Sequence, residues 1–395
     1  MSYLERAKAI FNDVVQARRQ IHRNPEVGFD LPETVKTVQE KLNEYGIACS
    51  RLGDSYALVG TLGDSSKGKT LLLRADMDAL PMKEKSDHAW VSQNENAHLC
   101  GHDMHTAILL AALKLLKEDE DRLKGQIKFL FQPAEETLNG GKLMLEKGIL
   151  DNPRPDAGMA VHMWPTAKEV GLLIPKKEVL ASALNFKVTV RGKGAHGAMP
   201  YSGVDPVFVG AQIVNNANGI IARELPSNKG ASLSMGSFNS IGGAVNIIPD
   251  TVEILGTSRS LYAESARHMV ERLPQVVDHT ARAFRAEADY EALADVPALT
   301  NTESFSELVK AAAEEALGTN YPVEYVDASL ASEDYAHIAS QLPQSCYFFI
   351  GCPLPDAEGN IYPLHNPRVL FNEEAIIAGS ASMAAAAVKW LEDNK

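Results

Sequence analysis

Apolar side chains follow two different patterns in the first and last parts of the chain. Residues 3–22 and the stretch from Pro32 to Gly46 carry them at helical spacing, and so does 106–116. Short continuous apolar runs, typical of buried parallel strands, occur at 69–73, 157–161 and 346–350, and residues 126–131 alternate as a further strand. Since strands and helices alternate, we predict an α/β domain with a central, mostly parallel sheet and flanking helices.

The middle of the chain follows another pattern. Alternating apolar residues at 186–190 predict a half-buried strand, and further elements are expected as a helix over 205–222, strands near 231–238 and 251–258, a helix over 263–285 and a strand at 287–290. The order β-α-β-β-α-β is that of a ferredoxin-like α+β domain. We therefore predict a first domain in two parts, residues 1–183 and 293–395, interrupted by an inserted domain over 184–292.

Metal-type ligands occur where the predicted strands of the first domain end. Glu135 and Glu136 follow the strand that Pro133 must end, His162 ends the next strand, and His365 follows the last. Active sites of α/β sheets lie beyond the carboxyl ends of their strands, so we expect these side chains to meet. Cys100 and His102 add a thiol and an imidazole, which would project toward one point if the backbone between them is extended. Alone, this Cys-Gly-His triplet equally fits a buried cysteine beside a hydrogen-bonded histidine.

Cys100, His102, Glu136, His162 and His365 together favour a catalytic metal centre. Five mixed ligands exceed the four of a structural zinc site, whereas two metals that share a bridging ligand would use five and leave room for water. Glu135 is the candidate base for that water. Asp78, after the strand at 69–73, is the candidate acceptor for the free N–H of a ligand imidazole. The plainer alternatives are a solvated Glu-Glu pair and an aspartate that caps a turn.

The inserted domain offers a second set of polar residues. His196 lies in the glycine-rich segment 192–197, Asn246 follows Gly242 and Gly243, and Arg259 follows a predicted strand. These three side chains could hold a substrate carboxylate or an oxyanion. The alternative is that they are ordinary turn residues and a surface arginine. The segment does not form the glycine fingerprint of a dinucleotide site.

Composition and charge restrict which binding partners and which cellular compartment we expect. The formal net charge of −13 over 395 residues argues against nucleic acid as a partner. The chain has no run of 18 apolar residues, so we expect no membrane span. The beginning of the chain lacks the apolar core of a signal peptide, and four cysteines in such a length do not make a disulfide framework. We therefore expect a cytoplasmic protein with reduced thiols.

The motifs together resemble one known family. They are Arg-Ala-Asp-Met-Asp-Ala-Leu-Pro (74–81), Cys-Gly-His-Asp-Met-His-Thr-Ala (100–107), Phe-Gln-Pro-Ala-Glu-Glu (131–136), Gly-Lys-Gly-Ala-His (192–196), Asn-Ile-Ile-Pro (246–249), Ser-Glu-Asp-Tyr (332–335) and Leu-His-Asn-Pro (364–367). In this order they are similar to those of the metal-dependent aminoacylases and carboxypeptidases. The similarity is to the amidohydrolase branch that holds hippurate hydrolase and the indoleacetyl-amino-acid hydrolases.

The resemblance implies a two-domain enzyme that hydrolyses the amide of an N-acyl amino acid at a dinuclear centre. By analogy the five residues above would be ligands, with Cys100 in a bridging place, and Glu135 the general base. The two ions could be zinc, manganese, cobalt or nickel. The inserted domain would mediate a homodimer, with His196 reaching the neighbouring active site. A dipeptidase or carboxypeptidase, an N-acetyldiaminopimelate deacetylase and a non-catalytic binding module remain alternatives. The segment Glu95-Asn96-Ala97-His98-Leu99, which precedes Cys100, differs from the Gly-x-Met-His-Ala usual in this branch. The resemblance therefore does not imply which substrate this chain takes.

Overall fold

The computed structural model describes residues 1–86 and 88–394, which form two compact units. The first unit comprises residues 1–177, 300–327 and 337 onward, and the second comprises 178–299 and 328–336. The second unit therefore contains the whole stretch 184–292 and extends a few residues beyond it at each end. Among the described residues, no helix is long and apolar enough to cross a membrane.

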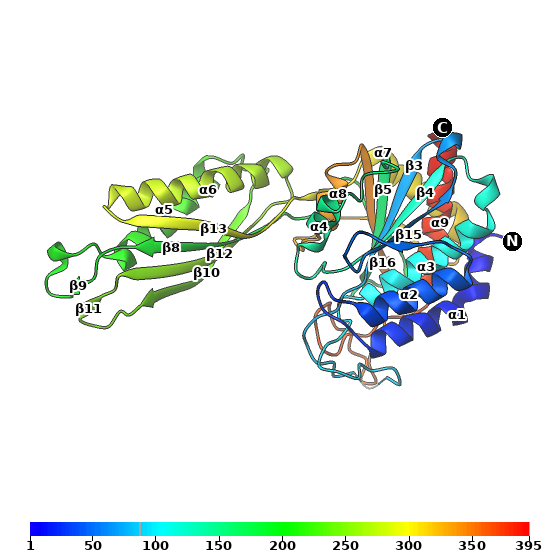
Figure 1. Cartoon of the computed structure of the whole chain (residues 1–395), viewed down its shortest axis with the longest axis horizontal. Coiled ribbons are helices and arrows are strands. Elements are labelled where there is room, and N and C mark those ends of the chain that lie inside the picture. Colours follow the sequence, from blue (N-terminus) through cyan, green and yellow to red (C-terminus); the bar gives the residue numbers. More distant parts are fainter. Residues whose placement is uncertain (87, 395) are drawn as a thin grey trace. The chain divides into compact units, whose positions relative to one another are not determined.

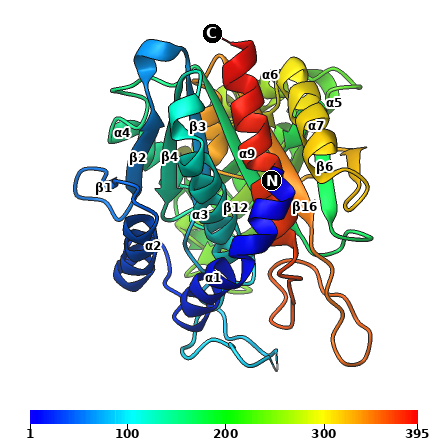
Figure 2. The ribbon, with the colours of Figure 1, turned by 90° about the vertical axis from the view of Figure 1, so that its right-hand side faces the viewer.

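The first unit consists of a large sheet with flanking helices (Figures 1 and 2). Its helices are α1 (Tyr3–Arg23), α2 (Pro32–Glu44), α3 (His102–Glu118), α4 (Gly140–Glu146), α7 (Glu303–Leu317), α8 (Tyr335–Ala339) at the border of the two units, and α9 (Ala375–Asp393). Its sheet has the strand order β1 (Ser50–Arg51), β2 (Leu58–Gly63), β4 (Gln126–Gln132), β3 (Thr70–Asp76), β5 (Ala157–Trp164), β16 (Gln344–Gly351), β6 (Gly171–Pro175), β15 (Val323–Val326).

The four predicted strands form the centre of this sheet. β4, β3, β5 and β16 are neighbours, and each adjacent pair is parallel. β3 is buried along its whole length, as its continuous apolar run predicts. The two edges are mixed, because β2 pairs with β4 and β6 with β16 in antiparallel fashion. The predicted mostly parallel α/β sheet is confirmed.

Helix α3 lies against the centre of the sheet, where Figure 2 shows it beside α9. Fourteen of its residues are buried, so it is apolar on nearly all sides and belongs to the core rather than to the surface. It packs against α1 and α9 as well as β3. The helix was expected from Thr106, but it begins at His102. The extended backbone considered between Cys100 and His102 is therefore wrong.

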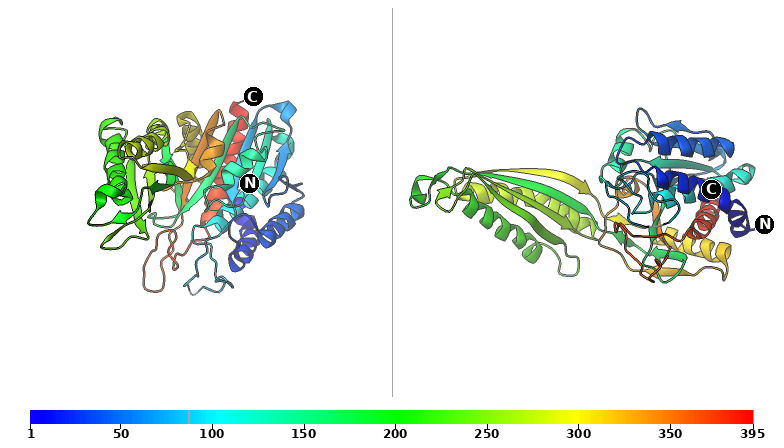
Figure 3. Two further views of the ribbon diagram at one scale, coloured as in Figure 1. Left: turned by 60° about the vertical axis from the view of Figure 1, so that its left-hand side comes forward. Right: turned by 90° about the horizontal axis from the view of Figure 1, so that it is seen from below.

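The second unit is a four-stranded antiparallel sheet with two helices on one face (Figures 1 and 3). Its strand order is β10 (Ser232–Ile241), β12 (Thr251–Arg259), β8 (Ala183–Arg191), β13 (Glu287–Val296), and its helices are α5 (Pro206–Arg223) and α6 (Ala263–Ala283). Phe186, Val188 and Val190 of β8 point into its core, as the alternation predicts. This is the predicted ferredoxin-like topology, extended by the small pairs β9 (Ala195–His196) with β11 (Ile247–Ile248) and β7 (Glu178–Leu180) with β14 (Leu299–Thr300).

Candidate metal centre

Three adjacent strands bring polar residues to one edge of the large sheet. Asp76 is the last residue of β3, Glu135 and Glu136 follow the end of β4, and His162 lies near the end of β5. Because these strands are parallel neighbours, their carboxyl ends lie side by side. The sequence expectation that these residues meet agrees with their positions in the structure.

Gly101 connects Cys100 to the helix that carries His102. Its φ of 90° is in the left-handed region, which glycine adopts without a steric penalty. A Cβ atom at this position would lie 3.0 Å from the side chain of Met163 and 3.2 Å from that of Phe371. The glycine thus permits the sharp turn that places the thiol and the imidazole at one end of α3.

The five predicted ligand residues lie close together, all within the first unit. The Sγ atom of Cys100 is 3.4 Å from His162 Nε2 and 3.3 Å from His365 Nε2. Glu136 Oε1 is 3.5 Å from His365 Nε2 and 3.8 Å from His102 Nε2. Three-residue groups able to hold an ion include Cys100–His102–His162 and Cys100–Glu136–His365, which share Cys100, and His102–Glu135–Glu136. Glu135 Oε2 is 3.8 Å from His102 Nε2.

Hydrogen bonds to the backbone aim two imidazoles at this cluster. His102 donates from Nδ1 to the carbonyl oxygen of Asp78 at 2.9 Å, and His162 donates from Nδ1 to that of Met163 at 2.8 Å. In the neutral ring the lone pair is then on Nε2, which is the tautomer that a metal ligand needs. Burial also lowers the pKa of His162 well below its usual value, which keeps that ring neutral.

The side chain of Asp78 has a second role that sequence reasoning missed. Its Oδ1 accepts the backbone N–H of Glu135 at 2.9 Å, and its Oδ2 accepts that of Glu136 at 3.1 Å. The carboxylate is 3.4 Å from His102 Nδ1, farther than the carbonyl of the same residue. Asp78 therefore orients the imidazole chiefly through its backbone and fixes the two glutamates through its side chain.

The donor set fits divalent metal ions. Glu136 Oε1 and His102 Nε2 are buried and have no hydrogen-bond partner in the described structure, although a buried polar atom is normally paired. Burial, together with the charge of Glu136, raises the pKa of the Cys100 thiol, and a bound cation would reverse this effect. Thiolate, imidazole and carboxylate are the ligand types that zinc and related ions take.

Asp76 and His105 form a buried pair behind the cluster. His105 donates from Nδ1 to Asp76 Oδ1 at 2.6 Å, and its Nε2 accepts the N–H of Met163 at 2.9 Å. Both ring nitrogens of His105 are therefore used by the protein. Burial opposes the charge on Asp76, but His102 and Arg74 outweigh it and hold the pKa of Asp76 well below its usual value. The two residues are 29 positions apart, so spacing along the chain does not predict that they pair.

The polar residues of the inserted domain lie in the second unit and do not all gather at one point. His196 and Asn246 are close, because Gly197 N donates to Asn246 O at 2.8 Å, and both line a cavity of about 470 Å³. His196 Nδ1 accepts the N–H of Ala198 at 3.1 Å, so the neutral ring carries its proton on Nε2 and presents a donor. Arg259 is the last residue of β12, about 26 Å along the strand from Thr251, the end nearer Asn246.

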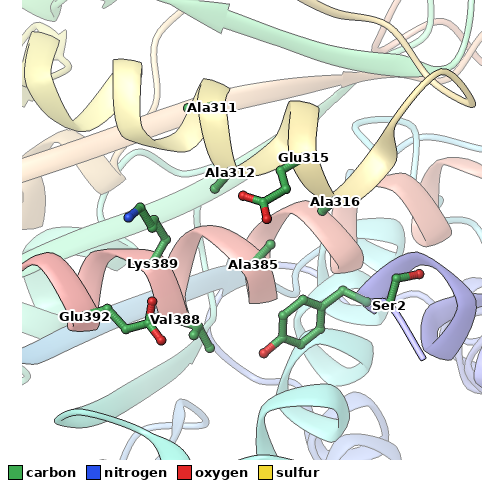
Figure 4. Close-up of a pocket in the computed structure, with 10 residues that line it drawn as sticks. Ser2, Ala311, Ala312, Glu315, Ala316, Ala385, Val388, Lys389 and Glu392 are labelled. Carbon is green, nitrogen blue, oxygen red and sulfur yellow. The ribbon is translucent and has the colours of Figure 1, made fainter.

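A further cavity, of about 330 Å³, lies between the start of α1 and helices α7 and α9 (Figure 4). Four of its ten lining residues are alanines, with Glu315, Lys389 and Glu392 at the sides, and the lining contains neither histidine nor cysteine. None of the predicted site residues lines this cavity.

Comparison with known proteins agrees with this geometry. Residues 72–389 match the model of peptidase family M20/M25/M40. The chain is 33% identical to thermostable carboxypeptidase 2 of Saccharolobus solfataricus, over 97% of this chain and 96% of the relative. It is also 33% identical to N-acetyl-L-cysteine deacetylase of Bacillus subtilis, over 97% and 89%. Identity to the hippurate hydrolase of Campylobacter jejuni is 31%, over 95% and 96%.

Solved structures share the whole architecture. A putative aminohydrolase from methicillin-resistant Staphylococcus aureus superposes with a TM-score of 0.90 at 30% identity, over 98% of both chains. A dinuclear metal-binding peptidase of the M20 family from Bacillus subtilis superposes with a TM-score of 0.80 at 26% identity, over 98% of this chain and 99% of the other. Two metal ions per chain are therefore a property of a structural relative.

Proposed function

This chain belongs to peptidase family M20/M25/M40, and from that premise we propose that it hydrolyses the amide bond of N-acyl amino acids in a metal-dependent reaction. The observation that carries this proposal is the cluster of five ligand side chains around Cys100, with Glu135 beside it. Relatives that remove acyl groups from N-acetylcysteine and hippurate support the substrate class.

We assign the two ions to ligands that the cluster supplies. Cys100 belongs to both groups of neighbouring donors and is proposed as the shared ligand, with His102 and His162 in one group and Glu136 and His365 in the other. Bound divalent ions would polarise the amide carbonyl and lower the pKa of water. Zinc, manganese, cobalt and nickel all suit this donor set.

Glu135 is proposed as the general base and acid. Its backbone is fixed by Asp78, and its carboxylate faces the cluster at 3.8 Å from His102 Nε2. Glu135 takes a proton from the attacking water and later gives a proton to the nitrogen of the leaving amine. The amide C–N bond breaks, the acyl group leaves as a carboxylic acid, and the amino acid leaves with a free amine.

His196, Asn246 and Arg259 are proposed to bind the substrate. The N–H on Nε2 of His196 and the amide of Asn246 suit an oxyanion or a carboxylate. Because Arg259 lies at the other end of β12, we propose that the three do not act on one substrate from the same chain. In a homodimer, His196 and Asn246 would serve the neighbouring active site.

We further propose that the enzyme works in the cytoplasm on small molecules. All four cysteines are free, with Cys100, Cys346 and Cys352 buried, which is typical of a reducing compartment. The net charge of −13 supports neither nucleic acid nor an anionic membrane surface as a partner.

The test is amine release from a panel of N-acetyl-L-cysteine, hippurate, N-acetyldiaminopimelate and dipeptides, with and without a chelator. We expect release from the acyl amino acids, loss with chelator, and recovery with one of the four metals. The carboxypeptidase relative favours a second candidate, and release from dipeptides alone would support that peptidase. Metal binding without release from any substrate would favour the binding module and contradict the proposal.

A further inference from the structure

A second group of metal-type ligands lies in the first unit, apart from the cluster around Cys100. It consists of His22 in the last turn of α1, and Glu84 and His88 in the segment that follows β3. His22 Nε2 is 3.2 Å from Glu84 Oε1, and His88 Nε2 is 2.9 Å from the same oxygen. One donor atom from each residue lies within 4.8 Å of the other two.

The 3.2 Å separations between His22 Nε2 and the Glu84 oxygens are near those of ligands on one metal ion, whereas the 2.9 Å separation from His88 Nε2 is shorter. Metal–nitrogen and metal–oxygen bonds of about 2.0–2.2 Å in a tetrahedral site place neighbouring ligand atoms about 3.3–3.5 Å apart. His22 Nε2 is 3.2 Å from both Glu84 oxygens, and a single N–H cannot point well at two acceptors. The arrangement therefore suits an ion between the rings and the carboxylate better than a simple hydrogen bond.

Neighbouring groups hold the ligands in the required orientation. His22 Nδ1 is 2.8 Å from Asp103 Oδ2, and because a carboxylate can only accept, the hydrogen lies on Nδ1. The lone pair of Nε2 then faces Glu84, as in the carboxylate–histidine–metal arrangement of many metal sites. Arg18 Nη2 lies 3.1 Å from the same ring nitrogen, a longer contact than that of Asp103, and Arg18 Nε pairs with Asp103 at 2.6 Å.

Glu84 and His88 are also fixed from outside the group. Glu84 Oε2 accepts the N–H of Ser92 at 2.7 Å, and Oε1 accepts a hydrogen bond from the Ser86 hydroxyl. The ring of His88 stacks on Trp90 with centroids 4.8 Å apart. The guanidinium of Arg19 lies 3.7 Å from the centroid of the Trp90 ring and forms an ion pair with Glu373. The segment therefore presents its two ligands from a packed support.

Two further observations point to a cation. His98 is fully buried beside this group, with its ring centroid 6.1 Å from that of His22, and neither of its ring nitrogens has a hydrogen-bond partner in the described structure. With neutral histidines, the carboxylates of Glu84, Asp103 and Glu373 outnumber the guanidinium groups of Arg18 and Arg19 by one charge. A buried unpaired charge is costly, so either a bound cation or a proton on His22 must balance it.

We propose that His22, Glu84 and His88 form a site for one divalent transition-metal ion of the zinc type, beside the buried ring of His98. The site is independent of the proposed amidohydrolase reaction. It would fasten Glu84 and His88 to α1. Lys85, which follows Glu84, donates its backbone N–H to Pro367 O at 2.7 Å and so contacts the loop that carries His365. The site is therefore structural, and it supports that loop from a distance.

The experiment is a count of zinc ions bound per full-length chain at saturating zinc, by elemental mass spectrometry after removal of excess metal. His88→Ala should bind one ion fewer than the wild type, and so should Glu84→Gln. His279→Ala is the matched control, because His279 is an exposed histidine of the second unit, and it should bind as many ions as the wild type.

Each outcome decides the proposal. Because the readout is the difference between variants, it is valid whatever number of ions the cluster around Cys100 binds. An unchanged count in both His88→Ala and Glu84→Gln would overturn the site and leave a proton on His22 as the cation. If His88→Ala loses its native circular dichroism, His88→Gln, which preserves volume and polarity, replaces it and the same difference of one ion is required.

Discussion

At the scale of single residues, Glu135 and Glu136 are adjacent in the chain but occupy different chemical positions. Ala134, which precedes them, has a φ of 62°, and non-glycine residues rarely adopt this conformation. Asp78 accepts both glutamate N–H groups and so holds the turn in place. Strain of this kind is maintained where the surrounding structure needs a particular side-chain direction. His365, with a φ of 63°, is a second example within the same cluster.

The first prediction concerns Glu135→Gln. The amide keeps the shape of the side chain but cannot take a proton from water, so we expect kcat to fall by at least about 100-fold. Metal content should remain that of the wild type, because Glu136 rather than Glu135 is the proposed ligand. Elemental analysis and steady-state kinetics measure the two quantities. Wild-type turnover in this variant would exclude Glu135 as the base.

His196→Ala is the second prediction. Removing one donor to a developing oxyanion typically costs about 100- to 1,000-fold in kcat. The side chain is exposed and bonded only to the N–H of Ala198, so the unfolding midpoint in urea should change little. His268→Ala, an exchange of the histidine that bonds Glu224 in the same unit, should leave kcat unaltered. Equal rates for His196→Ala and the wild type would remove His196 from the reaction.

At the scale of elements, the start of α3 depends on one glycine, and Gly101→Ala tests this. Both Gly101 and Gly46 have a positive φ, but a Cβ at Gly46 would have no atom within 4 Å, whereas one at Gly101 would contact Met163 and Phe371. Gly46→Ala should therefore lose only the left-handed penalty of about 1–2 kcal/mol, and Gly101→Ala more than that. Urea unfolding with chelator present compares them, and equal losses would contradict the steric argument.

The packing of α5 against α6 predicts a pH dependence. Glu224 caps α5 and accepts hydrogen bonds from Arg272 and His268 of α6, and chiefly through Arg272 its pKa is lowered to about 2. Because this pKa is lower in the folded than in the unfolded protein, the carboxylate stabilises the fold at pH values above its unfolded pKa of about 4.3. The stabilisation is lost as the pH falls toward about 2. Because the side chain is partly exposed, the amount is below about 1 kcal/mol.

Glu224→Gln should therefore be less stable than the wild type at pH 7, and the difference should shrink from about pH 4.3 downward. Urea unfolding at several pH values measures it, with Glu271→Gln on the exposed side of the same α6 as the control. A difference that grows as the pH falls would reverse the sign and contradict the assignment.

How far the sequence predicts the elements depends on where they lie in the sheet. β3 is buried along both faces, so its sequence is a continuous apolar run that predicts a strand. β2 has a mixed burial pattern and β15 is half-exposed, so neither sequence contains such a run. Helix α9 is rich in alanine and buried on almost every side, so it lacks an amphipathic period. Central strands are therefore easier to predict than the strands at the edges and the alanine-rich helix α9.

The candidate site divides in the same way. Its ligands lie in short motifs at strand ends, and the sequence predicted that they would meet. The pairing of Asp76 with His105 was not predicted because the two are joined only through the fold, and Arg259 was grouped with His196 although β12 separates them. The sequence shows which residue types follow each strand. It does not show at which end of a neighbouring strand their partner residues lie.

At the scale of the whole molecule, β10 is an edge strand of the second unit, paired only with β12 among the described residues. Unpaired edges offer backbone N–H and C=O groups to another strand. Ile241 at its end is 52% exposed, and Val245 beyond it is fully exposed. A second copy that pairs along this edge would cover both, which supports the proposed homodimer through the inserted domain.

The last prediction is a mass of twice 42.8 kDa in light scattering at micromolar concentration. Ile241→Glu places a charge in the proposed contact and should shift the protein toward the monomer, whereas Leu354→Glu, an exposed leucine of the first unit, should not. If His196 serves the neighbouring site, specific activity should fall with dilution in parallel with the loss of dimer. A fully active wild-type monomer would contradict both the dimer and the shared site, because His196 would then have no second active site to reach.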